Sequence, residues 1–258
     1  MKKLFAISSI LLVACNVNSS HNKFLLAERL LQDKKYEASV HEFQQIVDKE
    51  PNGDLGKDAL YRVATIQHHY MNNARAAEKT YRALLKRSTD KNFNKNIQET
   101  LANIYFDAFE DYPRAVETYS ALYKENIRGD EAEYYSFKIG KALFLMSRFS
   151  EAIEFFRKQQ ERYPKGKYFY KAELEIGNAY SASKDCKKAV KSFDLVRSAG
   201  DAELKPLATF AEASCYEDLD VLDKAYDLFA SIRGSYPVPS VVDLKMSKIK
   251  RRRILRRR

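Results

Sequence analysis

The fold of this chain is decided by the stretch Tyr170–Asp201, which reads YKAELEIGNAYSASKDCKKAVKSFDLVRSAGD. Apolar residues recur in its first half at helical spacing, at Ala172, Leu174, Ile176, Ala179 and Tyr180. Short polar residues interrupt the pattern over 181–185, and Gly200 follows a second apolar series at Ala189, Val190, Phe193 and Val196. The stretch therefore predicts two helices joined by a short turn.

The same pattern occurs six times along the chain. The windows start at Ser20, Asp58, Asn96, Glu133, Tyr170 and Pro206, in steps of 38, 38, 37, 37 and 36 residues. A small residue lies at the twentieth position of each window, at Ser39, Ala77, Ala115, Ala152, Ala189 and Ala225, and an aromatic residue four positions later, at Phe43, Tyr81, Tyr119, Phe156, Phe193 and Phe229. A period of this length is typical of a solenoid, so function is expected on an extended binding face.

Four residues of the quoted stretch, Gly177, Tyr180, Ala189 and Phe193, have the spacing of the tetratricopeptide repeat, which the chain resembles from about Asn22 to Pro237. The first three windows are looser, with Ala27, Thr65 and Asn103 where glycine is typical. The resemblance implies an all-α solenoid of about six helix-turn-helix repeats over residues 22–239. Gly177 is expected to let the partner helix approach closely, and Phe193 to fill the space beside it.

The first fourteen residues read as an export signal, with Lys2 and Lys3 followed by the apolar run Leu4–Val13. This run is too short for a permanent membrane span, which needs about 20 residues. Leu12-Val13-Ala14-Cys15 resembles a bacterial lipobox, which implies a lipid on Cys15 and a short tether over residues 15–21. Asn16 after the cysteine then implies the periplasmic face of the outer membrane. The alternatives are an ordinary cleaved signal and a buried amphiphilic start, and in both of these Cys15 has no role.

The length of the repeat indicates which group of tetratricopeptide-repeat proteins the chain resembles most. Steps of 36 to 38 residues, with helix endings such as Tyr163-Pro164 and Tyr236-Pro237, resemble the exported outer-membrane lipoproteins of the BamD and CpoB type. The chain departs from the CpoB type because it has no heptad-rich N-terminal coiled coil. It departs from the BamD type because it has six repeats where that family has about five, and because it carries a basic C-terminal segment. The type IV pilus pilotins also combine a lipid anchor with six repeats, generally with a spacing of about 34 residues.

In this repeat fold the first helix of each repeat lines the concave face. The offsets of the family place these partner-binding residues on that face: Arg62, Ile66, His69, Tyr70, Tyr134, Phe137, Lys141, Phe144 and Asn178. The same offsets also give Phe24, Leu31, Ile104, Asp107, Phe210 and Glu217. Aromatic anchors beside Arg and Lys are typical of protein interfaces. The alternative is that some of these side chains are buried between helices.

The excess of basic residues that gives the chain its formal charge of +10 lies at the C-terminal end. Residues 245–258 hold nine Lys and Arg and no acid, whereas residues 15–244 hold 34 basic and 35 acidic residues. Val242, Met246 and Ile249 predict a capping helix at the start of residues 240–258. The remaining segment is expected either to be a solubilising, partly frayed end or to bind an anionic surface such as lipid headgroups or peptidoglycan through Lys250, Arg251, Arg252, Arg253, Arg256, Arg257 and Arg258. A nucleic-acid partner is not expected, because the body is nearly neutral.

Two cysteines remain if Cys15 carries a lipid. Cys186 and Cys215 are expected near the same edge of two antiparallel helices, and in an oxidising compartment they form a candidate disulfide. The alternative is that both are small buried apolar residues.

The sequence carries no catalytic or metal-binding signature. The four histidines, His21, His41, His68 and His69, form no HExxH motif, and there is no Cys-x-x-Cys and no Gly-rich phosphate loop. We therefore expect a scaffold without a cofactor that binds envelope proteins, first in outer-membrane protein assembly. The alternatives are a pilotin-like role at a secretion or motility channel, and association with the cell wall.

Overall fold

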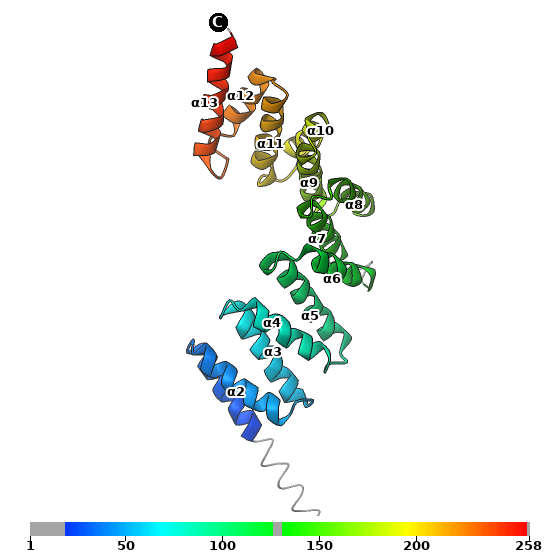
Figure 1. The fold of residues 1–258 in the computed structure, drawn as a ribbon, viewed down its shortest axis with the longest axis vertical. Coiled ribbons are helices and arrows are strands. Elements are labelled where there is room, and N and C mark those ends of the chain that lie inside the picture. Colours follow the sequence, from blue (N-terminus) through cyan, green and yellow to red (C-terminus); the bar gives the residue numbers. More distant parts are fainter. Residues whose placement is uncertain (1–18, 126–130, 257–258) are drawn as a thin grey trace, which may run out of the picture. The chain divides into compact units, whose positions relative to one another are not determined.

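The computed structural model describes residues 19–125 and 131–256, which form helices joined by short turns and contain no strand (Figure 1). The chain divides into two compact units, Met1–Glu110 and Asp111–Arg258. The predicted signal, Cys15, Arg257 and Arg258 lie outside the described residues.

In the first unit, each helix packs against the next one along the chain. Residues 19–32 are helical, and the further helices are α2 (Tyr36–Lys49), α3 (Asp54–His69), α4 (Ala74–Leu85), α5 (Lys91–Asn103) and the π-helical turn η1 (Ile104–Ala108). The π-helical turn lies where the third, loosely matching window has Asn103 instead of glycine.

The second unit repeats the pairing with greater regularity. Its helices are α6 (Tyr112–Glu125), α7 (Ala132–Leu145), α8 (Phe149–Arg162), α9 (Phe169–Ala182), α10 (Cys186–Ala199), α11 (Leu204–Asp218), α12 (Leu222–Ser231) and α13 (Pro239–Arg256). The quoted stretch forms α9 and α10, which confirms the two predicted helices.

The backbone confirms all six repeats. Non-glycine residues with positive φ occur at Lys34, Asn72, Glu110, Ser147, Lys184 and Asp220, with φ between 50° and 66°. These positions are separated by the same 38, 38, 37, 37 and 36 residues as the sequence windows. Each lies in the turn between the two helices of one repeat, so the left-handed residue marks the register of the repeat.

Hydrogen bonds explain why this turn recurs. In the fifth repeat, the N–H of Lys184 donates to the carbonyl of Ser181, and the N–H of Asp185 donates to the carbonyl of Tyr180. This is a Schellman motif, which satisfies the last carbonyl groups of α9 and needs a left-handed residue. The carboxylate of Asp185 then accepts the N–H of Lys188 and caps α10.

The glycines of two repeats allow ring packing between paired helices. A Cβ on Gly140 would lie 2.5 Å from the ring of Phe156, and a Cβ on Gly177 would collide in the same way with Phe193. Both rings are buried. The structure thus confirms that glycine lets the second helix of the repeat approach its first helix.

Buried carboxylates link the second helix of one repeat to the first helix of the next. Nη1 of Arg157 on α8 lies 2.6 Å from Glu173 on α9, and Nε of Arg197 on α10 lies 2.8 Å from Glu212 on α11. Both acidic side chains are almost completely buried. Because burying a lone carboxylate is costly, these pairs fix how successive repeats stack.

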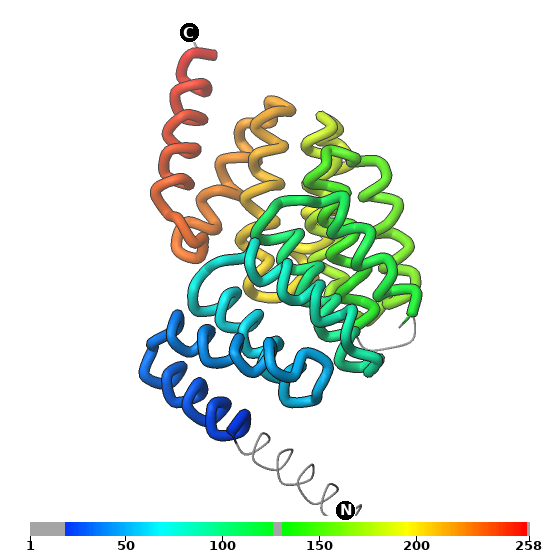
Figure 2. Tube along the Cα trace, turned by 60° about the horizontal axis from the view of Figure 1, so that its bottom comes forward, coloured from blue at the N-terminus to red at the C-terminus, as the bar shows by residue number. Residues whose placement is uncertain are grey.

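The last described helix covers the end of the sixth repeat, as predicted. Val242 and Ile249 of α13 are buried in one cluster with Ala225 and Phe229 of α12 and with neighbouring apolar residues. Figure 2 shows α13, in red, beside the orange helix α12, which it contacts. The fold is therefore a helical solenoid of paired helices with a capping helix.

Candidate functional site

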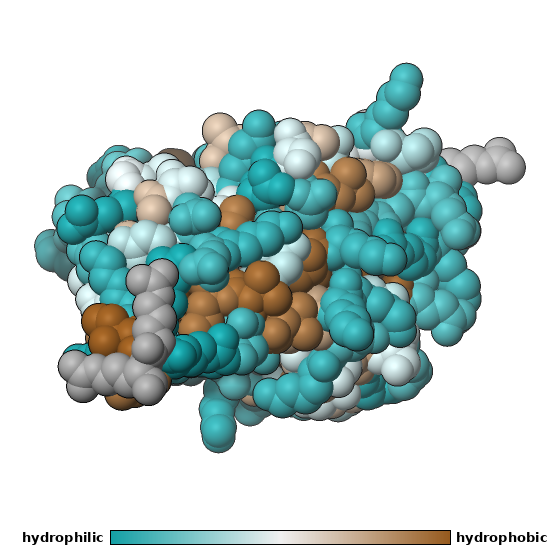
Figure 3. Space-filling view, turned by 90° about the horizontal axis from the view of Figure 1, so that it is seen from above, coloured by the Kyte–Doolittle hydropathy of each residue, from teal (hydrophilic) through white to brown (hydrophobic). Residues whose placement is uncertain are grey.

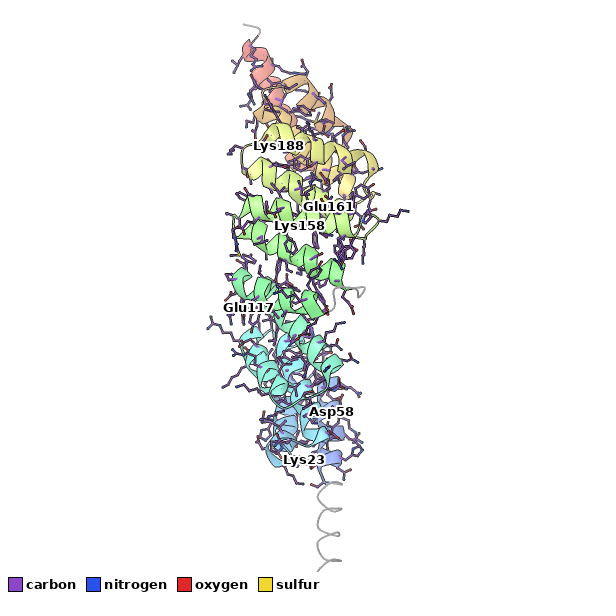
Figure 4. The ribbon with its side chains drawn as sticks, turned by 90° about the vertical axis from the view of Figure 1, so that its right-hand side faces the viewer. Lys23, Asp58, Glu117, Lys158, Glu161 and Lys188 are labelled. Atoms are coloured by element: carbon purple, nitrogen blue, oxygen red, sulfur yellow. The ribbon has the colours of Figure 1, made fainter. Side chains whose placement is uncertain are left out.

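The second unit has two layers of helices. Its first helices α7, α9 and α11 contact one another in succession, and each also contacts its paired second helix. The second helices α8 and α10 present charged side chains outward, as Lys158, Glu161 and Lys188 show in Figure 4. The candidate partner-binding surface is therefore the face of the first helices, α7 and α9.

Three predicted residues meet in one polar cluster on this face. Nζ of Lys141 on α7 lies 2.6 Å from Oε1 of Glu175 on α9, and Nδ2 of Asn178 donates to the other oxygen of Glu175 at 3.3 Å. Nζ of Lys141 also lies 5.1 Å from the ring centre of Phe144. The structure thus brings Lys141, Phe144 and Asn178 together around Glu175.

Two further predicted residues form an aromatic cluster at the start of α7. The ring of Phe137 stacks on Tyr168 with 5.0 Å between ring centres, and Tyr134 lies 6.0 Å from the same Tyr168 ring. Phe137 also contacts the buried ring of Phe156. Phe137 is therefore partly a packing residue, which the sequence analysis allowed as an alternative.

The turn between α8 and α9 wraps around a carboxylate of α7. The backbone N–H groups of Lys167 and Tyr168 donate to the two oxygens of Glu133 at 3.0 and 2.7 Å. A Cβ on Gly166 would lie 2.0 Å from this carboxylate, so a larger residue there would make the end of the Glu133 side chain shift. Glu133 therefore positions Tyr168 against Phe137.

Sequence reasoning missed Glu133, Tyr168 and Glu175, which position the predicted residues. Tyr168 precedes α9, whereas the family offsets count positions within the first helices only. The aromatic and basic segment over 163–171, YPKGKYFYK, was a signal that could have identified it.

In the first unit, the predicted residues have unequal roles. Nε of Arg62 lies 2.9 Å from Oε1 of Glu28, and the ring of Tyr70, whose residue is 52% exposed, stacks on Tyr36 at 5.3 Å. His69 is exposed, and its ring lies beside the ring of His68. His68 is half-buried, and this burial lowers its pKa.

The assignment of Ile66 to the partner-binding face is wrong. Ile66 is 0% exposed, so its side chain belongs to the core of the first unit. The family offset selected the position, but the apolar Ile66 is fully buried there, whereas the polar Lys141 and Asn178 at the same position of later repeats are half-buried. The predicted partner-binding face takes residues from both units, and its continuity from Arg62 and Tyr70 to Phe137 and Lys141 stays a prediction.

The basic segment differs from the expectation of a partly frayed end, because α13 is helical through Arg256. Glu217 on α11, with a side chain 3% exposed, lies 2.8 Å from Nζ of Lys245 and 3.0 Å from Nζ of Lys248. Nη1 of Arg252 lies 3.6 Å from the same carboxylate. These cations hold α13 against α11.

Three of the residues assigned to an anionic surface have acidic partners within the chain. Arg252 and Arg256 pair with Asp220, and Arg253 pairs with Asp223. Lys250 lies over the ring of Tyr226, 5.5 Å from its centre. Much of the predicted anion-binding charge is therefore directed toward α11 and α12.

The candidate disulfide is not formed in the structure. Cys186 and Cys215 are free thiols, although both belong to one buried cluster with Ala189 and Phe193. Burial raises the pKa of Cys215 to about 12, and the thiol of Cys215 lies 3.5 Å from the hydroxyl of Ser181. The prediction that they lie toward the same edge is confirmed, but the pair has the character of small buried apolar residues.

Within residues 19–125 and 131–256, no group of His, Cys, Asp or Glu side chains is arranged to hold a metal ion.

An open hollow of about 290 Å³ in the first unit is lined by Asp54, Lys57, Asp58, Ser88, Asp90 and Phe93. A hydrogen bond from Lys57 lowers the pKa of Asp54.

Among the helices that the structure describes, none has the length and apolar character needed to cross a membrane.

Comparison with known proteins agrees with the fold. Residues 100–167 match the model of the tetratricopeptide repeat family. No curated protein sequence gives a match. Taken with the six repeats, the match shows that the chain has the tetratricopeptide-repeat fold.

Solved structures resemble the chain over most of its length. PilF of Pseudomonas aeruginosa is 14% identical with a TM-score of 0.54, and the alignment covers 91% of this chain and 98% of PilF. PilW, a widely conserved type IV pilus biogenesis factor, is 13% identical with a TM-score of 0.57, over 90% and 98% of the two chains. The C-terminal part of a repeat protein from Cytophaga hutchinsonii is 18% identical with a TM-score of 0.59, over 81% and 78%. At these identities the likeness shows the fold.

Proposed function

We propose that this chain is a membrane-anchored adaptor of the periplasm, which binds envelope proteins through the first-helix face of its second unit. The tetratricopeptide-repeat fold supports a role in protein–protein interaction, and the predicted signal and lipid on Cys15 would hold the chain at the outer membrane. The proposal needs no cofactor.

The observation that carries the proposal is the cluster of Lys141, Glu175, Asn178 and Phe144. Half-buried charged and amide groups lie here beside an aromatic ring, on a face built by two successive first helices. A partner that binds on this face would bury the aromatic ring and form its own polar contacts with the aligned Lys, Glu and Asn side chains. Aromatic and charged residues in such partly buried sites are typical of binding hot spots.

The candidate roles differ in their support. The likeness to PilW over nearly the whole of both chains favours a pilotin-like role at a pilus or secretion channel. The step of 36 to 38 residues favours outer-membrane assembly. Association with the cell wall has less support, since Arg252, Arg253 and Arg256 pair with acids of the same chain.

The experiment compares proteins that copurify with the chain after crosslinking of intact membranes. The altered chain carries Lys141→Glu and Asn178→Lys, and the matched control carries Lys188→Glu and Ser198→Lys on the second helix α10, with the same net change of charge. We expect the first pair of changes to remove a discrete envelope protein that the control retains. A barrel-assembly protein, a channel protein or peptidoglycan fragments would identify the role, and equal copurification with both variants would refute the assignment of the face.

A further inference from the structure

Positive charge gathers in the turn between α8 and α9 and in the first turn of α9. Lys165, Lys167 and Lys171 occur within the nine residues 163–171, which contain no acid. None of the three forms an ion pair with a carboxylate in the part of the chain that the structure describes. Their charges are therefore available to a partner.

Some lysines of the second helices do have acidic partners. Lys158 on α8 lies 2.6 Å from Glu154, and Lys188 on α10 lies 2.8 Å from Asp185. On α10, Lys187 and Lys191 have no such partner among the described residues, so the lack of an ion pair alone does not set Lys165, Lys167 and Lys171 apart. What distinguishes the cluster is that two of its lysines lie beside one aromatic ring, which offers a partner a charged and an apolar contact in one place.

Aromatic rings lie between these lysines. Nζ of Lys171 and Nζ of Lys167 lie 5.5 and 5.9 Å from the ring centre of Tyr168, and Tyr168 stacks on Phe137. The Glu133 carboxylate fixes this arrangement through two backbone N–H groups. The rings and the ammonium groups thus form one preorganised surface.

From this arrangement we infer that Lys165, Lys167, Lys171 and Tyr168 bind an acidic segment of the partner protein. The inference rests on the proposed function and names the chemistry of its partner. Carboxylates would pair with the three ammonium groups, and an apolar side chain would lie on the Tyr168 ring. A membrane surface fits less well, because the rings of Tyr134, Phe137 and Tyr168 are half-buried and leave little apolar surface for insertion.

The test uses the purified full chain and a fluorescent octapeptide of Glu, Asp, Leu and Phe, with a Gln and Asn counterpart of the same apolar residues. We expect the acidic peptide to bind by fluorescence anisotropy at low salt, and the neutral peptide to bind far more weakly. The variant Lys165→Glu, Lys167→Glu, Lys171→Glu should weaken binding at least about tenfold. The matched control Lys184→Glu, Lys187→Glu, Lys191→Glu carries the same charge change and should retain binding.

Several outcomes would overturn the inference. These are equal binding of the two peptides, absence of binding, an equal loss in both triple variants, or stronger binding to anionic phosphatidylglycerol vesicles than to the acidic peptide. Circular dichroism and thermal unfolding of each variant establish that it folds. If the copurified protein survives the Lys165, Lys167 and Lys171 changes but is lost with Lys141→Glu and Asn178→Lys, the inference fails and the proposed function stands.

Discussion

Lys245 of the terminal helix donates to Glu217 of α11 at 2.8 Å, and this pair joins two segments separated by 28 residues in the sequence. Lys248 and Arg252 approach the same carboxylate. The basic segment thus acts within the chain, where its cations surround one buried acid and hold the capping helix in place.

Replacing that acid should loosen α13. Glu217→Gln leaves Lys245, Lys248 and Arg252 without a full negative charge, and we expect a loss of about 1–2 kcal/mol, since the three cations are partly exposed. Hydrogen exchange should become faster in α13 and remain unchanged in α7. Asp243→Asn is the control, because its pair with Arg233 is exposed and should be worth no more than about 1 kcal/mol. If α13 is equally protected from hydrogen exchange in Glu217→Gln and in the unaltered chain, Glu217 does not hold this helix in place.

The contact between Glu217 and the cations of α13 should weaken at low pH. Burial alone would raise the pKa of Glu217, but hydrogen bonds from Lys245 and Lys248 outweigh burial and hold the pKa below its ordinary value. The stabilisation is therefore complete above the unfolded pKa of about 4.3 and is lost as the pH falls through the lower folded value. Denaturation at a series of pH values should show less acid dependence in Glu217→Gln. An unchanged acid profile would contradict the assignment.

The glycine of the fifth repeat should not tolerate a methyl group. Gly177→Ala places a Cβ against the ring of Phe193, and we expect a net loss of about 1–2 kcal/mol despite the better helix propensity of alanine. The double variant Gly177→Ala, Phe193→Leu should recover part of the loss caused by crowding. Urea denaturation of the single and double variants provides the measurement. A stabilised Gly177→Ala protein would show that the ring can move at no cost.

The left-handed turn predicts a stabilising change. Lys184 has φ of 66° without being glycine, so Lys184→Gly should relieve strain and raise the free energy of unfolding by up to about 1 kcal/mol. Lys191→Gly in the middle of α10 should instead lower it by about 1 kcal/mol. Thermal unfolding of the two variants should therefore shift in opposite directions, and shifts in the same direction would argue against strain at Lys184.

The two buried cysteines should remain thiols in the native protein. The high pKa of Cys215 keeps its thiolate population small, and burial shields both residues from reagents. Differential alkylation with mass spectrometry should label Cys186 and Cys215 only after unfolding. A disulfide-linked peptide pair from the native chain would contradict this and restore the sequence prediction.

The repeat register could be predicted from the sequence because it depends on local patterns. Small and aromatic residues recur at fixed spacing, and the positive-φ residues Lys34 to Asp220 follow the same steps. The packing of Gly177 against Phe193 was predictable for the same reason, since both residues belong to one repeat.

The details of the site depend on contacts between repeats, which the spacing alone does not determine. The offsets that placed Ile66 on the surface treat every repeat alike, whereas the same position is fully buried at Ile66 and half-buried at Lys141 and Asn178. The partners of Arg252 and Arg256 lie more than 30 residues earlier in the sequence, and Tyr168 reaches Phe137 only because Glu133 holds the turn. None of these pairings leaves a periodic signal.

The central claim is that partners bind on the first-helix face of the second unit. The most direct measurement places a photo-crosslinking amino acid either at Asn178 on α9 or at Lys188 on α10 and compares the products in intact cells. We predict that Asn178 gives a discrete crosslink to an envelope protein and that Lys188 does not. A crosslink of equal yield from both positions, or from Lys188 alone, would contradict the account.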